Sequence, residues 1–600
     1  MKMDSLRRVV VTGIGAVTPI GLTFPEFWKN ALAGKSGVGQ IESFDTSEYS
    51  VTIAGEIKDF DPDNCFDKKL ARRMDRFIQF AYAATLESLA DSGLDLDSVD
   101  RDRAGIFIGS GIGGATVAAG LAPSGARILI LEAGDHIADR PENRDQRAIF
   151  QRGHFRPKEM WYEADGTAFN PGNYYNVGGN SKFYGAVLLR YRAEDFAEMK
   201  HREGVSPAWP FPYEELEPWY TEAERLYAVR GALGEDPTEP AHSAPYAFPP
   251  VPDEPAIAAV REKLRQAGLH PYSLPLGVDL DRWLTKAKTP WDAHPNSDDG
   301  KMDAETPALA MALRHPNVTL ETRARVTRLE TAPDGGRIVA VHVQREGGPE
   351  RIAPRLVILS AGAVQSAALL LRSANDRHPS GLANSSDQVG RNFMNHNSSA
   401  VLAISPSYRN TSIYQKTFGF NDFYLGDGKG GAPLGNVQLL GRVSGQILKA
   451  NMPKVPEWLL ERISRHAIDF YAMSEDVPHP ESRVLVDGDR IILKWHRTNW
   501  DAHLDLVADL KRALRAAGFP IVLSRPFDKR TPSHQCGTVR IGHAPATAPL
   551  DIWCRSFDHP NLFVVDASFL PTSAAVNPAL TIAAQALRVA AHIRKEDLAA

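Results

Sequence analysis

The chain has 600 residues and a mass of 65.8 kDa, more than one hydrophobic core usually serves, so we expect several domains. Its composition, 43% hydrophobic and 24% charged, lies in the globular range and excludes a long disordered or collagen-like tract. The formal net charge is −5 and no dense basic block occurs, so nucleic acid is not an expected partner.

The cysteines and the apolar runs argue against a disulfide-stapled protein, a zinc protein and a membrane protein. Cys65, Cys536 and Cys554 are too few and too scattered for a disulfide framework or a four-ligand zinc site, and no His-Glu-x-x-His spacing occurs, so we expect no metal. The amino terminus lacks the apolar core of a signal peptide. No run approaches the roughly 18 apolar residues of a spanning helix. We therefore expect a cytoplasmic protein with no membrane span.

The first elements in chain order predict an α/β layer. Residues 7–15, "RRVVVTGIG", form a β-branched run that breaks on glycine, which predicts a buried strand and a tight loop. Residues 71–89 place apolar side chains at helical spacing, and Gly93 follows as a stop signal, so a helix is expected there.

A βαβ unit with a glycine-rich turn is predicted next. Residues 104–108 read as a strand, 109–114 as the turn, 115–121 as a helix and 127–131 as a second strand that ends at Glu132. This order is typical of dinucleotide-binding domains, although glycine-rich turns also occur without that role.

Each glycine of this turn has its own physical reason. Gly109 permits the turn, Gly111 lets the backbone approach a pyrophosphate, and Gly114 allows close helix packing. Amides at the helix N-terminus would face the phosphates. Glu132 would bind the ribose hydroxyls, and its charge argues against a 2′-phosphate, so NADP is disfavoured.

Later segments predict further strands, a helix and a proline-rich linker. An apolar strand is expected at 356–359, ending at a ligand loop, and seven prolines between 237 and 255 predict a loop or linker. Short alternating runs from 391 to 523, with a hairpin turn at Asp487-Gly488, predict the sheet of a substrate domain. A strand at 562–565 and a helix at 579–593, with Pro578 at its first position, close the chain.

The first hundred residues carry a family resemblance. The segments "RRVVVTGIGAVTPIG", "GKSGVGQIESFD", "ARRMDRFIQFA" and "IGSGIGG" resemble β-ketoacyl-acyl-carrier-protein synthases of the thiolase fold, over residues 1 to about 114. Such enzymes need a nucleophilic cysteine at a strand-to-helix elbow and two histidines, and none of the three cysteines lies in such a segment. The resemblance implies ancestry without activity, and a partial layer of this kind is expected to expose apolar surface.

The rest of the chain resembles another family. The segments "NVGGNSKFYGAVLLRYR", "RLVILSAGAVQSAALLLRSA", "VGRNFMNH", "SHQCGTVRIG" and "NLFVVDASFLPTSAAVNPALTIAAQ" are similar to glucose-methanol-choline (GMC) oxidoreductases, over about 104–595. This implies an α/β fold with a Rossmann-type FAD-binding domain and an α+β substrate domain on an antiparallel sheet, preceded by the partial thiolase-like segment. The two resemblances meet within "GSGIGG", which indicates a fusion.

Domain boundaries follow from the two resemblances. We expect a thiolase-like segment at 1–103, FAD-binding parts at 104–240 and 311–394, a proline-rich connector with substrate-domain elements at 241–310, the substrate domain at 395–530, and a C-terminal FAD-binding part with the catalytic residues at 531–600.

The cofactor implied by the second resemblance is FAD. The resemblance places residues 178–184, here called the flavin loop, beside the isoalloxazine ring. Some relatives carry a histidine linked to the flavin in this neighbourhood, whereas this chain has Lys182-Phe183-Tyr184, so the FAD is expected to be non-covalent. By analogy with the family, Asp566 would contact the ribityl chain of the flavin, but as a buried acid it could equally cap a helix. The candidate cofactor residues are Gly109, Gly111, Ile112, Gly114, Glu132, Gly178, Gly179, Asn180, Val326, Ala361, Gly362, Asp566, Ala567, Asn577 and Pro578.

Two residues are expected to carry the chemistry. Alcohol oxidation needs a base for the hydroxyl proton, and His534 can serve because imidazole titrates near neutrality without a metal. Asn577 matches the family's partner position and would hydrogen-bond the substrate oxygen. Alternatively, His534 is an ordinary loop histidine with satisfied hydrogen bonds.

The sequence therefore predicts an FAD-dependent oxidoreductase that oxidises the CH–OH group of an alcohol, polyol or sugar. A dehydrogenase is favoured over an oxidase; oxygen, a quinone and a carrier protein stay open as acceptors, as does the oligomeric state. One alternative is an inactive ketosynthase-like transferase. Another is a non-catalytic fusion in which the strand at 104–108 belongs to the ketosynthase layer and disrupts the flavin site.

Overall fold

The computed structural model describes residues 13–47, 49–65, 75–92, 104–297, 300–426, 431–531 and 534–598. The chain divides into two compact units, Met1–Arg101 and Asp102–Ala600. This division falls next to the boundary predicted at 103 and 104, whereas the other domain boundaries stay predictions.

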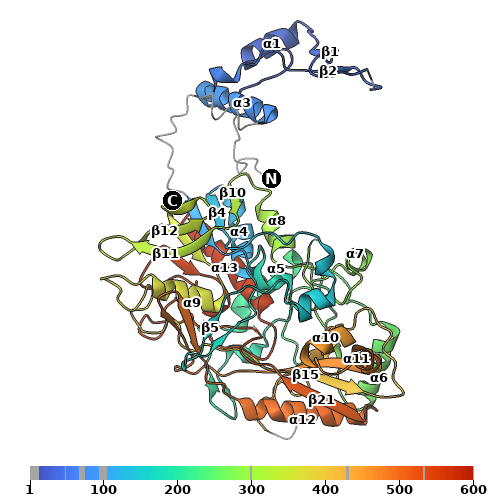
Figure 1. Cartoon of the computed structure of the whole chain (residues 1–600). Coiled ribbons are helices and arrows are strands. Elements are labelled where there is room, and N and C mark those ends of the chain that lie inside the picture. The colour runs from blue at the N-terminus through green and yellow to red at the C-terminus, as the bar shows by residue number, and fades with distance from the viewer. Residues whose placement is uncertain are drawn as a thin grey trace, which may run out of the picture. The chain divides into compact units, whose positions relative to one another are not determined.

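The first unit is small and open (Figure 1). Its elements are α1 (Phe24–Leu32), the antiparallel pair β1 (Val38–Gln40) and β2 (Ile53–Gly55), and α3 (Arg76–Ser92). The predicted helix at 71–89 thus has a described part that begins at Arg76, while 71–74 and the strand predicted before residue 13 lie outside the described residues.

The described residues of this unit form almost no core. Among its described apolar side chains only Phe60 is buried, whereas Trp28, Leu32 and Phe77 are 53%, 73% and 68% exposed. Cys65 follows a single helical turn and is half-buried. An apolar surface of this size without a core is what a partial layer would leave exposed.

The second unit is built around a parallel sheet. Its five strands lie in the spatial order β10-β4-β3-β14-β22, and every neighbouring pair is parallel. In chain order this arrangement is 3-2-1-4-5, the doubly wound order of dinucleotide-binding domains. The strands are β3 (Ala104–Ile108), β4 (Arg127–Leu131), β10 (Val318–Glu321), β14 (Leu356–Leu359) and β22 (Leu562–Val564).

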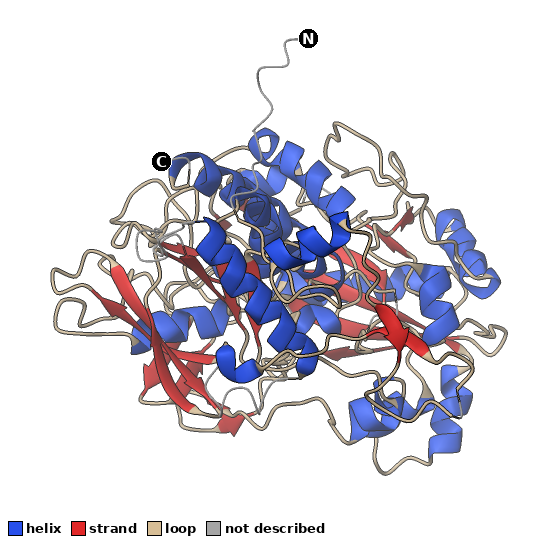
Figure 2. Ribbon diagram, turned by 90° about the horizontal axis from the view of Figure 1, so that it is seen from above, coloured by secondary structure: helices blue, strands red, loops and turns tan. Residues whose placement is uncertain are grey.

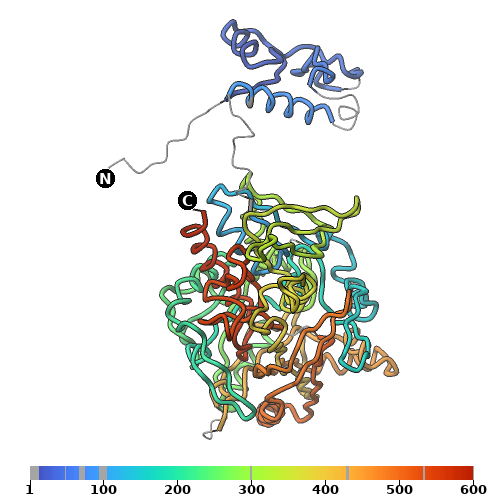
Figure 3. Tube along the Cα trace, turned by 90° about the vertical axis from the view of Figure 1, so that its left-hand side faces the viewer, coloured from blue at the N-terminus to red at the C-terminus, as the bar shows by residue number. Residues whose placement is uncertain are grey.

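The predicted strands are confirmed here, and β3 is the centre of this sheet. Because β3 pairs with both β4 and β14, it is not left to a ketosynthase layer. Helices α4 (Ile112–Leu121), α5 (Tyr213–Leu226) and α13 (Ala579–Glu596) pack together. Figure 3 shows the C-terminal segment, in red, beside the light-blue segment that begins the unit. A Cβ on Gly120 of α4 would lie 2.6 Å from Ala590 of α13, so glycine permits this close packing.

The second large sheet is antiparallel. Its six strands lie in the order β21-β15-β18-β17-β16-β9. Helices α6 (Pro255–Gln266) and α12 (Trp500–Ala516) share an apolar core with it, and Figure 1 shows α12 along the β15 and β21 side. The strands are β9 (Tyr272–Ser273), β15 (Asn397–Ile404), β16 (Phe418–Phe420), β17 (Asn436–Leu439), β18 (Ala467–Ser474) and β21 (Ile521–Pro526).

Strand β17 contributes to two environments. Val437 and Leu439 belong to the core beneath α6 and α12. Because side chains alternate along a strand, Asn436 and Gln438 face the other side of the sheet, where both are fully buried.

Smaller sheets complete the unit (Figure 2). The hairpin predicted around Asp487-Gly488 forms, but it lies in a separate four-stranded sheet, β19-β20-β5-β6, and not in the six-stranded one. Its bounds are β5 (Trp161–Tyr162), β6 (Ala168–Phe169), β19 (Arg483–Asp487) and β20 (Arg490–Lys494); the other strands are β7 (Met199–Lys200), β8 (Val205–Ser206), β11 (Arg325–Thr331), β12 (Ile338–Arg345) and β13 (Gly348–Ile352).

The proline-rich connection and the remaining helices complete the second unit. The proline-rich segment has no helix or regular strand before α6 begins at Pro255. No helix within the described ranges is long and apolar enough to cross a membrane. The other helices are α7 (Leu280–Lys286), α8 (Ala310–Ala312), α9 (Ala363–Arg372), α10 (Gly445–Asn451) and α11 (Glu457–Ser464).

Deleting residues 1–101 should leave FAD binding intact, because all five strands of the parallel sheet come from the second unit. The flavin absorbance per chain of the purified truncated protein measures this. A truncated protein that folds but no longer retains FAD would contradict the assignment of the sheet to residues after 103.

Candidate active site

The turn after β3 packs directly on the turn after β14. Gly109 has φ 98°, in the left-handed region, and a Cβ there would lie 2.4 Å from the Ser360 carbonyl oxygen. A Cβ on Gly114 would lie 2.2 Å from the carbonyl oxygen of Gly109. Gly113, to which sequence reasoning gave no role, is the tightest position, because its Cβ would lie 1.8 Å from the Val565 oxygen.

Other glycines leave space open at the same edge of the sheet. A Cβ added to Gly111 or Gly362 would meet no described atom within 4 Å. Gly111 is the N-cap of α4, so N–H groups of the first helical turn point into this space. A Cβ on Gly179 of the flavin loop would lie 3.8 Å from the Gly111 Cα. Two glycine loops facing one another at a helix N-terminus fit a dinucleotide pyrophosphate.

Glu132 lies at the end of β4, beside the turn. Its buried carboxylate accepts hydrogen bonds from Ser110 N at 3.1 Å, Ser110 Oγ at 2.7 Å and Gly134 N at 3.0 Å. Ser110 Oγ also accepts from Gly178 N at 3.0 Å, which ties the flavin loop to the turn. Ala324 N donates to the Glu132 carbonyl at 2.9 Å, which brings β11 and its Val326 to this side. Contacts of Glu132 and Val326 with the cofactor stay predictions.

Two buried lysines, Lys182 and Lys301, fasten the flavin loop, a role that sequence reasoning gave to neither of them. Lys182 pairs with Asp303 at 3.2 Å and also contacts Glu305. Lys301 Nζ donates to the carbonyls of Lys182 and Tyr184, at 3.1 and 3.0 Å, and burial lowers the pKa of Lys301 to about 7. Gly178 itself has φ 85°, and a short 3-10 helix, Gly179–Lys182, follows it.

Asp566 caps a helical turn, as one of the two sequence interpretations expected. Its carboxylate accepts from Ser568 N at 2.8 Å, at the start of the 3-10 turn Ala567–Phe569, and from Gly362 N at 3.0 Å. Ala361 N donates to Ser366 Oγ at 3.1 Å. The acid therefore fastens the loop after β14, and its contact with the ribityl chain stays a prediction.

The two predicted catalytic residues meet, although 43 residues separate them. Asn577 Nδ2 lies 3.3 Å from His534 Nε2, and Asn577 Oδ1 accepts from Gln438 Nε2 at 2.9 Å. His534 has φ 66°, a left-handed conformation that histidine adopts more readily than most residues. Pro578 is the N-cap of α13, one position before the predicted one, so Asn577 immediately precedes that helix.

A second histidine fixes the tautomer of His534. His396 Nδ1 lies 2.8 Å from His534 Nδ1, and His396 Nε2 lies 2.8 Å from the carbonyl oxygen of Ser573. Because a carbonyl only accepts, neutral His396 carries its proton on Nε2, and His534 must then donate from Nδ1. His534 Nε2 is left with a lone pair beside Asn577. His396 belongs to the quoted segment "VGRNFMNH", but its spacing from His534 gave no sign of the contact.

Burial keeps His534 neutral. It lowers the pKa of His534 well below its ordinary value, and the nearby His396 and Lys416 lower it further. Burial also lowers the pKa of His396. Neutral His534 can accept a proton at neutral pH, as a general base must.

Two of the three cysteines, Cys536 and Cys554, show none of the features of a nucleophile. Cys536 and Cys554 are buried, and burial raises the pKa of both thiols, so neither is present as a thiolate. No cluster of three or more metal-ligating side chains occurs among the described residues.

The fold and this edge of the parallel sheet have the features of a dinucleotide-binding domain. Residues 172–398 and 490–586 match the GMC oxidoreductase family models, and residues 6–138 match the N-terminal domain of β-ketoacyl synthase. The chain is 30% identical over 525 residues to paromamine 6'-oxidase of Streptomyces fradiae, covering 82% of this chain and 92% of that protein. It is also 30% identical over 542 residues to 2-methyl-1,2-propanediol dehydrogenase of Mycolicibacterium austroafricanum, covering 82% and 95%.

The amino-terminal part has other relatives. Over 112 residues the chain is 49% identical to 3-oxoacyl-[acyl-carrier-protein] synthase 2 of Staphylococcus aureus, but this covers only 19% of this chain and 27% of that enzyme.

Among solved structures, pyridoxine 4-oxidase from Mesorbium loti aligns with a TM-score of 0.57 at 20% identity, covering 81% of this chain and 98% of that one.

The chain belongs to the GMC oxidoreductase family, with a ketosynthase-like segment before it. It is an FAD-dependent enzyme that oxidises CH–OH groups, as the sequence predicted. The predicted fold class is also confirmed.

Replacing Gly111 by alanine should weaken FAD binding at least tenfold without lowering the stability of the FAD-free protein. The new methyl group meets no described protein atom but occupies the space opposite Gly179. Titration of apoprotein with FAD and chemical unfolding measure the two effects. Gly105→Ala, inside β3, is the matched control, because its methyl group makes an ordinary 3.6 Å contact with Phe107. Equal FAD affinity in G111A and wild type would show that this space is not the cofactor site.

Proposed function

We propose that His534 is the base and Asn577 the orienting residue in the oxidation of a small alcohol, polyol or sugar. The observation that supports this most directly is the lone pair on His534 Nε2 beside the Asn577 amide. The alternative that His534 is an ordinary loop residue does not explain why this nitrogen is kept unprotonated.

The residues around the open space at Gly111 and Gly362 fit FAD. The α4 N-terminus with Gly109, Gly111, Ile112 and Gly114 would hold the pyrophosphate, and Glu132 and Val326 would contact the adenosine part. Bound FAD supplies the hydride acceptor for the carbinol carbon. The remaining proposed contacts with the flavin are Gly178, Gly179, Asn180, Ala361, Gly362, Asp566, Ala567, Asn577 and Pro578.

The chain's own residues would move the proton and hold the alcohol. His534 Nε2 accepts the hydroxyl proton, and His396 holds the ring through Nδ1. In this structure one N–H of Asn577 points to His534 Nε2; the alcohol hydroxyl would replace it as the donor to that nitrogen, and Asn577 would donate to the substrate oxygen, which keeps the reacting carbon in line. The N-terminal end of α13, directly after Asn577, favours negative charge that develops there.

The substrate class rests on the relatives. Paromamine 6'-oxidase and 2-methyl-1,2-propanediol dehydrogenase are named for polar alcohols, one a sugar derivative and one a diol. We propose a polar alcohol of this kind for the present enzyme. Both an oxidase and a dehydrogenase are among the relatives, so the preference for a dehydrogenase stays a prediction, as do the electron acceptor and the cytoplasmic location.

The FAD should be non-covalent. The flavin loop around Lys182, Phe183 and Tyr184 contains no histidine that could bond to the isoalloxazine ring. After acid precipitation of the yellow protein, the flavin is expected in the supernatant. Flavin that stays with the pellet would contradict this proposal.

Anaerobic absorption spectra test the proposed reaction. Bound oxidised flavin should bleach on addition of one member of a panel of 2-methyl-1,2-propanediol, glucose, paromamine and benzyl alcohol. Substituting His534→Gln should slow this bleaching by about 10²- to 10⁴-fold, because a positioned base typically contributes that much. His543→Gln, at an exposed position, is the control. Undiminished bleaching in H534Q would rule out His534 as the base.

A further inference from the structure

A row of buried amides extends from Asn577 into the six-stranded sheet. Gln438 Nε2 donates to Asn577 Oδ1 at 2.9 Å and to Asn436 Oδ1 at 3.0 Å. Asn436 Nδ2 donates to Asn421 Oδ1 at 2.7 Å, and Asn421 Nδ2 donates to Asp236 Oδ2 at 2.8 Å. Asn421, Asn436 and Gln438 are at most 1% exposed, so water does not compete for these bonds.

The row has one direction because its far end can only accept. A primary amide can turn over and exchange its oxygen and nitrogen, so none of the three amides fixes a direction by itself. Asp236 is a carboxylate, paired with Arg192 at 2.7 Å, and has no proton to give. Asn421 must therefore present N–H to Asp236 and oxygen to Asn436, and the same choice passes to Gln438.

In this orientation the side-chain oxygen of Gln438 is left without a hydrogen bond. Both of its N–H groups are used on oxygens, whereas its own buried Oε1 has no hydrogen-bond partner among the described residues. A buried acceptor left unpaired costs free energy, so the neighbours and not Gln438 itself set its orientation.

The orientations set by Asp236 and by the Ser573 carbonyl are compatible at the contact between Asn577 and His534. From Asp236, the row delivers an N–H to Asn577 Oδ1, which leaves Asn577 Nδ2 facing His534. From the Ser573 carbonyl, the histidine pair leaves His534 Nε2 unprotonated. Donor and acceptor therefore face each other, which requires that neither row be reversed.

We propose that Asp236 is a positioning residue for the oxidation, acting through Asn421, Asn436 and Gln438 to decide which atom of Asn577 faces His534 and the alcohol. The proposal rests on the proposed roles of His534 and Asn577. With the row reversed, Asn577 would present its oxygen to His534, favour the protonated imidazole and lose the N–H that holds the substrate oxygen.

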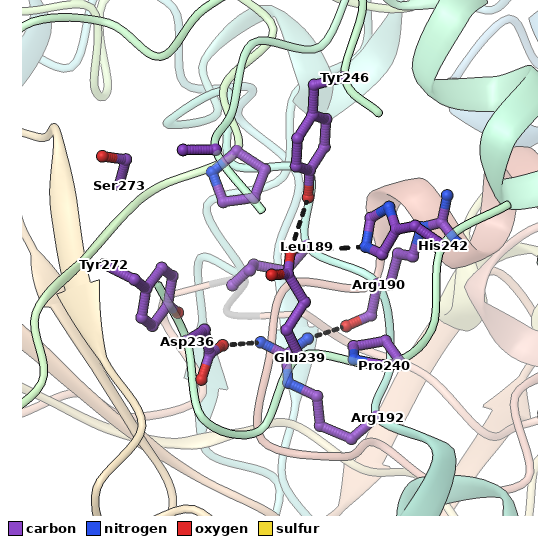
Figure 4. A pocket seen from close by; sticks show the side chains of 12 residues that line it. Leu189, Arg190, Arg192, Asp236, Glu239, Pro240, His242, Tyr246, Tyr272 and Ser273 are labelled. Carbon is purple, nitrogen blue, oxygen red and sulfur yellow. Dashed lines mark hydrogen bonds and ion pairs between the residues drawn. The ribbon is translucent and has the colours of Figure 1, made fainter. Parts of the chain in front are cut away.

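Asp236 is well placed for such a role because it is itself held firmly. Figure 4 shows its ion pair with Arg192 beside Tyr272, in a pocket that His534 does not line. Asp236 Oδ1 accepts from Thr238 N and Oγ1, both at 2.9 Å. The phenol oxygen of Tyr272 accepts from Asn436 at 3.2 Å but could also donate, so it cannot replace Asp236 in setting the direction.

The charged groups around His534 define the background of the test. His396 and Lys416 act on it directly, and Lys416 is paired with Asp292 at 2.8 Å. Glu475 acts on His396. None of these groups belongs to the amide row, so changing an amide leaves their charges in place.

The test breaks the row and then restores its direction. Asn421→Leu, similar in volume, cuts the link while keeping the pair of Asp236 and Arg192. Asn421→Leu/Asn436→Asp then places an acceptor-only group where Gln438 needs one. The first readout is the acidic limb of kcat/KM against pH, with the alcohol of the panel that bleaches the flavin. The second is the ¹⁵N shift of the His534 ring nitrogens in histidine-labelled protein, which does not depend on turnover.

In wild type the limb should lie below pH 6.5, because the base is lost only when His534 is protonated and its pKa is lowered. N421L should move the limb and the ¹⁵N titration of His534 upward by about one pH unit. It should also lower kcat/KM on the alkaline side by about tenfold. The double variant should move both back down, although its added negative charge alone would raise the pKa of His534.

An unchanged limb and ¹⁵N titration in N421L, or a further upward shift in the double variant, would overturn the proposal. If N421L does not fold, Asn421→Ala serves in its place with the same expectations. Failure of the proposed function looks different, because wild-type flavin would then not bleach with any alcohol, whereas the ¹⁵N titration would still report the direction of the row.

Discussion

The site depends on two groups that can only accept hydrogen bonds, the Ser573 carbonyl and the Asp236 carboxylate. Each lies at the end of a row of groups that could otherwise face either way, His396 and His534 in one row and the amides in the other. Because the interior excludes water, an incorrect orientation cannot be repaired by solvent, so the two ends together determine where protons lie at His534 and Asn577. The histidine is a usable base because of these distant acceptors as well as its own burial.

The predicted cofactor-binding edge of the parallel sheet depends on close backbone packing rather than on side chains. The turn after β3 contacts the loops after β14 and β22 so closely that Gly109, Gly113 and Gly114 cannot carry a Cβ, while Gly111 faces open space. The same turn is where the ketosynthase-like and oxidoreductase-like parts of the chain meet. The structure assigns β3 to the centre of the oxidoreductase sheet, and the described residues before it have almost no core of their own.

Local patterns could be predicted, and long-range contacts could not. The strands at 104–108, 127–131 and 356–359 were predictable because each is a short apolar run bounded by glycine or charge. The hairpin around Gly488 was also local, but its sheet partner is β5, more than 300 residues earlier in the chain, so the wrong sheet was expected. The pair of His534 and Asn577 came from the family resemblance. The alternation of polar Asn436 and Gln438 with apolar Val437 and Leu439 in β17 was the local signal of the amide row.

The central claim, that His534 Nε2 is an unprotonated base held beside an amide N–H, can be tested by neutron diffraction from crystals of the FAD-loaded enzyme exchanged into D₂O near pH 7.5. The account predicts deuterium on His396 Nε2 and His534 Nδ1, none on His534 Nε2, and a deuterated Asn577 Nδ2 facing that nitrogen. Deuterium on His534 Nε2, or an Asn577 oxygen facing it, would contradict the account.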